Sequence, residues 1–177
     1  MRNIALLASR TVLGTYLAVH GAQKMFGAFG GPGLDAAGKG FHAMGLTPGK
    51  PFATLAAASE IGGGLLTVAG IADPIGPIAI AGSMAVAGAV HRKAGPMAAK
   101  GGYELPAANL ALALALAAAG PGKLKVGGTL PKQLTQIAIA GAVALTGLSL
   151  AKLLTHKPAP VAESTVTEST AAETAAS

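Results

Sequence analysis

The chain has 177 residues, of which 51% are hydrophobic and only 11% are charged, and its formal net charge is +6. Ordinary soluble domains carry about a quarter charged residues, so the composition argues against a soluble domain and predicts a membrane protein. Cysteine is absent, which excludes disulfides, thiol catalysis, cysteine-type zinc sites and iron–sulfur clusters. The lysines and arginines lie scattered in short loops between apolar runs, a pattern that sets membrane orientation and argues against nucleic-acid binding.

Five apolar runs predict an all-α membrane protein. It consists of a four-helix transmembrane bundle, a fifth C-terminal transmembrane helix and a disordered tail. The first and third runs reach the length of a span, about 17 to 25 residues, only with their polar ends near Gln23 and Arg92. The fourth run alternates leucine and alanine, the period of a strand, but both residues favour helix, and a lone strand would leave its backbone unpaired in lipid. The runs are 4–19, 52–71, 75–90, 103–120 and 134–154.

The segments between the spans suggest an orientation and a set of domains. Leu34, Ala37, Phe41 and Met44 stand near helical spacing, which predicts a short amphipathic helix on the membrane surface that ends at Gly45. Basic residues are in excess in the first and third loops, which predicts that these loops are cytoplasmic and that the N-terminus is outside. The predicted domains are a core at 1–122 with an interfacial loop at 24–50, a basic loop at 123–133, an additional transmembrane helix at 134–155 and a disordered Ser/Thr/Glu tail at 156–177.

Polar residues of separate spans are expected to meet at one membrane face, because alternating spans bring the first and third loops to the same side. A charge at mid-bilayer costs about 3 kcal/mol, so Arg10 and Glu60 are predicted to face inward and pair, unless Glu60 is protonated. Ser83 and Asn109 fall in the same inner layer. The predicted pocket opens toward a cluster made of His20, Lys24, His91, Tyr103 and Glu104.

Each of these features also has a purely structural interpretation. An Arg10–Glu60 pair can simply lock two helices together. The histidines at 20 and 91 can mark the headgroup boundary, and axial haem ligation is a further alternative for them. The glycines at 62, 63 and 64 predict close approach of a neighbouring helix or ligand. No residue pattern predicts a metal site, and no residue is assigned a catalytic role.

Several motifs resemble the DoxX family of small integral membrane proteins over residues 4–122. They are HGAQKMFGAFGGPG from His20, AAASEIGGGLLTVAGI around Glu60, AVH ending at His91, GGYELP at 101–106 and GPG at 120–122. The resemblance implies a bacterial four-helix membrane core with the polar cluster as its shared feature. It also implies a relation to subunits of a thiosulfate:quinone oxidoreductase and to membrane assemblies that handle sulfur and oxidative stress. The sequence departs from the family after Gly122, where KLKVGG replaces a Ser-Leu-Asp type of ending.

These observations favour a multi-pass subunit of a redox, oxidative-stress or sulfur-handling complex in the plasma membrane, which binds a quinone in the polar pocket. The chain is expected to have no cofactor of its own and no catalysis on its own, and its expected partners are the lipid bilayer, redox enzymes and further copies of itself. Two alternatives stay open. One is a scaffold that recruits soluble detoxifying enzymes through its loops and tail, and the other is a carrier of protons or small solutes.

Overall fold

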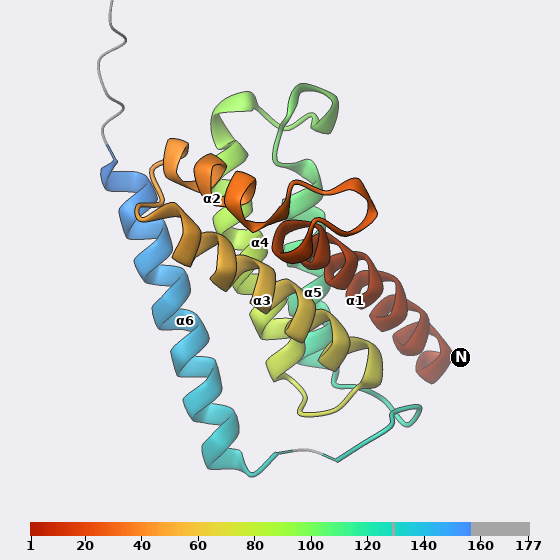
Figure 1. Ribbon diagram of the computed structural model, residues 1–177. Helices are drawn as coiled ribbons and strands as arrows, with labels where there is room; N and C mark the ends of the chain where they lie inside the picture. Colours follow the sequence, from red (N-terminus) through yellow and green to blue (C-terminus); the bar gives the residue numbers. More distant parts are fainter. Residues whose placement is uncertain (129, 157–177) are drawn as a thin grey trace, which may run out of the picture.

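Six α-helices and three short 3₁₀ helices make up the regular structure of residues 1–128 and 130–156, the part of the chain that the computed structural model describes (Figure 1). The described residues form no strand, so the predicted all-α class is confirmed. The elements are α1 (Arg2–Phe26), η1 (Ala28–Gly30), α2 (Gly33–Ala43), α3 (Gly49–Ala69), α4 (Ile75–His91), η2 (Arg92–Ala94), η3 (Ala98–Lys100), α5 (Glu104–Ala119) and α6 (Lys132–Thr155).

Each apolar run of the sequence corresponds to a helix, but the helices differ in their suitability as membrane spans. Helices α3 and α6 are long and apolar enough to cross a membrane, and α5 is apolar but has only 16 residues. The count of four spans plus one therefore stays a prediction. From residue 157 onward, the predicted tail at 156–177 lies outside the described residues.

The two helices that were hardest to predict both form as expected. The leucine–alanine repeat is helical in α5, where Leu116 is buried and Leu114 is exposed, so the leucines do surround the cylinder. The predicted amphipathic helix is α2, which ends at Ala43 before Gly45 adopts a φ of +94°. This left-handed conformation suits glycine, which has no side chain to clash with the backbone.

Helices α1 and α3 are antiparallel and pack closely through glycine. A Cβ atom added at Gly14 would lie 2.5 Å from the carbonyl oxygen of Gly64, and one added at Gly21 would lie 2.7 Å from the carbonyl oxygen of Ala57. Small residues of this kind let two backbones approach, as they do in membrane helix pairs. The two contacts also fix the register, because Gly14 is level with Gly64 and Gly21 is level with Ala57.

The three consecutive glycines of α3 do not share one role. A Cβ atom at Gly64 would meet α1, and one at Gly63 would lie 3.0 Å from the carbonyl oxygen of Gly76 in α4. A Cβ atom built on Gly62 would meet no atom of another described helix within 4 Å, so its role as a packing glycine stays a prediction. The three glycines differ for a geometric reason, since successive residues of a helix point in directions about 100° apart.

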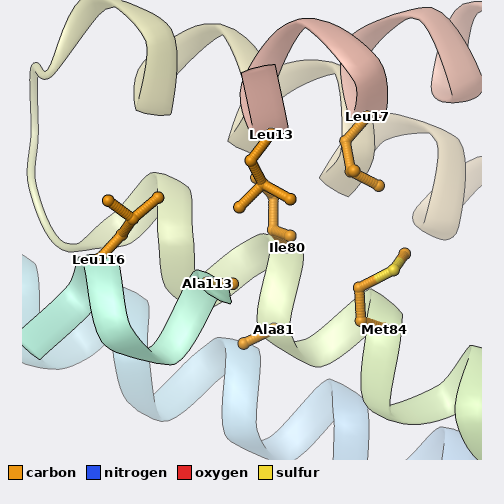
Figure 2. Packing of buried hydrophobic residues seen from close by; sticks show 7 residues of the cluster. All are labelled: Leu13, Leu17, Ile80, Ala81, Met84, Ala113 and Leu116. Carbon is orange, nitrogen blue, oxygen red and sulfur yellow. The ribbon is translucent and has the colours of Figure 1, made fainter. Parts of the chain in front are cut away.

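Helix α4 is the centre of the bundle and packs against α3, α5 and α6. Figure 2 shows Leu13 and Leu17 of α1 pointing toward Ile80 and Met84 of α4, with Leu116 of α5 beside them. Helix α6 lies at the edge of the bundle (Figure 1), where Thr146 approaches Gly82 of α4. The hydrophobic core is therefore formed by α1, α4 and α5, whereas α6 packs against the outer side of α4.

Candidate functional site

Glu60 is buried where α1, α3 and α4 meet, with only 2% of its surface exposed. The ammonium group of Lys24 donates a hydrogen bond to its Oε2 atom, and the Ser83 hydroxyl donates to Oε1 at 3.0 Å. His20 Nδ1 lies 3.1 Å from Lys24 Nζ and 4.0 Å from Glu60 Oε2. The buried carboxylate thus has a cation and a hydroxyl as partners, the arrangement that a buried charge requires.

The direction of the helices explains why Lys24 reaches Glu60. Side chains on a helix lean toward its N-terminus. Because α1 and α3 are antiparallel, the side chain of Lys24 leans down along α1 while that of Glu60 leans up along α3. Lys24 also lies in the last turn of α1, where a positive charge is favourable to the helix dipole.

Arg10 does not pair with Glu60, so the predicted Arg10–Glu60 ion pair is wrong. Its guanidinium donates to the backbone carbonyls of Val68 at 3.0 Å, Leu124 at 2.9 Å and Pro121. The α1–α3 register places Arg10 level with Val68, about two helical turns or 12 Å beyond Glu60. The N-terminal tilt then turns its side chain away from Glu60 and toward the end of α3.

A cavity of about 650 Å³ opens beside the Glu60 cluster. Residues from all six α-helices, from the segment after α2 and from the segment before α5 line it, and most of its wall is apolar. Six of the nine predicted pocket residues line this one space, and they are His20, Lys24, Glu60, Ser83, His91 and Asn109.

Arg10, Tyr103 and Glu104 are not among the described residues that line the cavity, which corrects their placement in the predicted pocket. Glu104 instead accepts a hydrogen bond at 2.8 Å from the backbone N–H of Ala98 and so holds the loop before α5. Tyr103 stands at the N-cap of α5, and its backbone N–H bonds to the carbonyl oxygen of Gly95.

The two histidines lie at the same end of the bundle, as the alternation of spans predicts, since both line this cavity. His91 Nδ1 lies 2.7 Å from the carbonyl oxygen of Gly101. A carbonyl only accepts, so the neutral ring carries its proton on Nδ1 and leaves Nε2 as an acceptor. The ring of Tyr16, which the sequence analysis did not single out, lies 5.5 Å from that of half-exposed His20.

Helix α6 also contributes to the cavity, although the sequence analysis placed the pocket within the first four helices. Its contributing residues include Ala138, Ala142, Thr146 and Ser149. These four small residues recur at spacings of three and four, the period of one helix face. That pattern in the printed sequence is the signal that could have assigned α6 to the pocket wall.

Within residues 1–128 and 130–156, no group of three or more histidine, aspartate or glutamate side chains is placed to hold a metal ion. The titratable groups at the cavity are arranged instead as a chain of hydrogen-bonding partners. It runs from half-exposed His20 through Lys24 to buried Glu60 and on to Ser83. Such a chain can bind polar atoms of a ligand and can hold or pass a proton.

A helical bundle with an ion pair buried beside a largely apolar cavity, and with two helices suited to cross a membrane, is characteristic of a small membrane protein. Residues 5–92 match the family model of DoxX, and the chain belongs to the DoxX family, which is membrane-associated. The matched region contains His20, Lys24, Glu60, Ser83 and His91, and it ends before α5 and α6. No curated protein and no solved structure matches the chain.

Proposed function

We propose that this protein is a multi-pass plasma-membrane subunit of a redox assembly that handles sulfur or oxidative stress, and that its cavity binds the headgroup of a quinone. In this proposal α1, α3, α4 and α5 form the four-helix membrane core and α6 is the fifth span. One observation carries the proposal: the ion pair of partly buried Lys24 and buried Glu60 borders a cavity of about 650 Å³ with mostly apolar walls. That volume lies in the range of about 300 to 1,000 Å³ typical of small-molecule sites.

The charges and donors around the cavity favour a neutral ligand that accepts hydrogen bonds. The charges of Lys24 and Glu60 balance each other, so the site offers no net charge to an ionic ligand. Lys24, His20 and the amide of Asn109 are donors in the cavity wall. A quinone has two carbonyl acceptors on an otherwise apolar ring, which matches a few polar groups set in an apolar wall.

Proton supply is the second task that the cluster can perform. A quinone takes up electrons and protons together when it is reduced, and a partner oxidoreductase provides the electrons in this proposal. Glu60 and Lys24 hold a proton beside the cavity, and His20 connects them to the half-exposed end of α1. Histidine suits this connection because its imidazole ring can both accept and donate a proton.

Quinone content of the purified full-length protein tests the proposal. The wild type is extracted in detergent and its lipids are analysed for quinone, together with Glu60→Gln and a control, Asp35→Asn, which alters an exposed ion pair whose two residues do not line the cavity. We expect quinone with the wild type and the control, and about tenfold less with Glu60→Gln, because the Lys24 ammonium that donates to the quinone loses the carboxylate that holds it in place, and one charge-assisted hydrogen bond changes affinity by about that order. A wild type without quinone, or a folded Glu60→Gln protein with the wild-type amount, would overturn the proposal.

The scaffold alternative depends on the tail at 158–177, which lies outside the described residues, so it stays a prediction from the sequence. Retention of soluble partners by the full chain and their loss on deletion of that tail would support it. The carrier alternative predicts that Glu60→Gln changes proton or solute flux in liposomes. Neither has a structural observation comparable with the ion pair at the cavity.

A further inference from the structure

We propose that α6 walls a separate compartment of the cavity that receives the isoprenoid tail of the quinone, and that Ala138 and Ala142 decide whether a tail fits. This inference rests on the proposed function and adds the part of the ligand that the Glu60 cluster does not contact. It also gives α6, which lies outside the family match, a role in ligand choice.

The two helices that form the compartment run side by side in the same direction. The backbone N–H of Ala72, just before α4, bonds to the carbonyl oxygen of Gly128, just before α6, at 3.3 Å. Midway along, Gly82 of α4 meets Thr146 of α6. Ser83 is therefore nearly level with Thr146, and Ala138 lies about two turns or 12 Å farther from His91.

The cavity wall beyond Ser83 toward the start of α4 is apolar. On α4 it consists of Ile75, Ile78 and Ala79, and on α6 it consists of Ala138, Ile139 and Ala142. The polar lining groups of the Glu60 cluster lie level with Ser83 or nearer to His91. One continuous space thus has a polar part at the ion pair and an apolar part between α4 and α6.

Small residues predominate on the cavity face of α6. Five of its seven lining residues are small, namely Ala138, Gly141, Ala142, Thr146 and Ser149, and the two large ones are Ile139 and Leu145. Large side chains such as Ile137, Val143 and Leu148 are exposed on the other face, and Val143 is 63% exposed. If α6 served only to pack against α4, larger side chains would be expected to fill this space, since interiors pack with few voids.

The cavity is long enough to hold a ligand that carries a tail as well as a headgroup. The α6 residues that line it run from Ala138 to Ser149, about 16 Å at a rise of about 1.5 Å per residue. A headgroup held at Glu60 and Ser83 occupies only one part of that length. An unbranched acyl chain of a phospholipid is the competing occupant, and a phospholipid headgroup is anionic or zwitterionic, which the balanced Lys24–Glu60 pair does not favour.

The test compares quinones that share a headgroup but differ in tail length. Dissociation constants are measured for the full-length protein in detergent with a tailless quinone and with quinones of one, two and more isoprene units. The variant is Ala142→Leu, which fills the compartment, and the control is Val143→Leu, which places a leucine at the neighbouring exposed position. Partition of a tailed quinone into detergent micelles affects the measurements on the wild type and on the variants equally. The quantity compared is therefore the Kd of the variant divided by the Kd of the wild type, at each tail length.

We expect a ratio near one for the tailless quinone and a rise to about tenfold or more for tailed quinones with Ala142→Leu, because overpacking of this size excludes the chain. Val143→Leu should give a ratio near one throughout. If Ala142→Leu does not fold, as judged by its thermal unfolding, Ala138→Leu replaces it at the next inward position.

The outcomes separate the two proposals. A ratio that stays near one at every tail length, with normal headgroup binding, overturns the tail compartment and leaves the proposed function intact. Failure of every quinone to bind the wild type overturns the proposed function and this inference with it. Native mass spectrometry showing a phospholipid that Ala142→Leu displaces, while quinone binding is unaffected, assigns the compartment to an acyl chain and contradicts the proposal.

Discussion

Two cations on the same helix, buried Arg10 and partly buried Lys24, behave in opposite ways. Arg10 donates hydrogen bonds to three backbone carbonyls at one end of α1, and among the described residues it takes no part in the cavity wall. Lys24, at the other end of α1, pairs with Glu60, lines the cavity and keeps 19% of its side-chain surface exposed. Burial of a charge therefore does not identify a site by itself. What distinguishes Lys24 is that its ion pair faces a space that a ligand can enter.

Arg10 has a structural role, because it connects two segments of the chain at its end of the molecule. Its carbonyl partners belong to the last turn of α3 and to the segment after α5, which the guanidinium ties together. A further hydrogen bond holds the same segment against α3, because the backbone N–H of Val126 donates to the carbonyl oxygen of Ala69 at 2.9 Å. The segment that leads to α6 is thus anchored under the bundle by Arg10.

Replacement of Arg10 by methionine should give the largest loss of stability. Three part-buried hydrogen bonds to carbonyls are lost, and each unsatisfied group costs about 1 to 3 kcal/mol when buried, so we expect the free energy of unfolding to fall by about 3 kcal/mol. Thermal unfolding in detergent measures it, and Arg2→Met is the control because exposed Arg2 has a single carbonyl partner, Ala119. Quinone binding by the folded fraction should persist. Loss of quinone binding without loss of stability would contradict this assignment, because Arg10 would then be the cation that serves the ligand.

Glu60→Gln should show the opposite balance, a moderate loss of stability and a large loss of binding. Lys24 loses its anion but stays partly hydrated, so the expected loss is about 2 kcal/mol, below the 3 to 5 kcal/mol for fully buried pairs. Addition of Lys24→Met should recover most of that stability, because it removes the unpaired charge. A double variant as unstable as the sum of the single variants would show that the two residues do not act as a pair.

The neighbouring glycines of α3 allow a sharper comparison within one helix. Gly64→Ala should lower the free energy of unfolding by about 1 to 3 kcal/mol, because its Cβ atom would lie 2.9 Å from the backbone nitrogen of Ala18 in α1. Gly62→Ala should raise stability by up to about 1 kcal/mol, since alanine is the better helix former and the position is open. Equal effects of the two substitutions on the unfolding temperature would contradict the close packing of α1 against α3 at Gly64.

The exposed ion pair of Asp35 and Lys50, with 2.8 Å between Lys50 Nζ and Asp35 Oδ1, should give the smallest effect. The hydrogen bond from Lys50, and then its positive charge, lower the pKa of Asp35. A lowered pKa stabilises the fold above the ordinary carboxyl value of about 3.9, and this contribution is lost as the pH falls through the lowered pKa. The unfolding temperatures of wild type and Asp35→Asn should differ slightly near pH 6 and converge at acidic pH, and a difference that grows on acidification would be inconsistent with this pair.

The sequence predicted the helices well because hydrophobic length and helix propensity are local properties. It also placed His20 and His91 at the same end, since alternation of spans needs no side-chain detail. The Arg10–Glu60 prediction failed because depth along a span was judged without the antiparallel register and the N-terminal tilt of side chains, which together separate the two residues. The packing roles of Gly14 and Gly21 and the contribution of α6 to the cavity wall were not predicted for a related reason. These roles depend on which helix lies opposite.

The central claim is that the Lys24–Glu60 pair serves a ligand and does not merely lock α1 to α3. The most direct test is the quinone content of the purified double variant Lys24→Met/Glu60→Gln, whose fold should be nearly as stable as the wild type. Our account predicts a folded protein with about a tenth or less of the wild-type quinone. A stable double variant that retains the wild-type amount would reduce the pair to a structural contact and contradict the account.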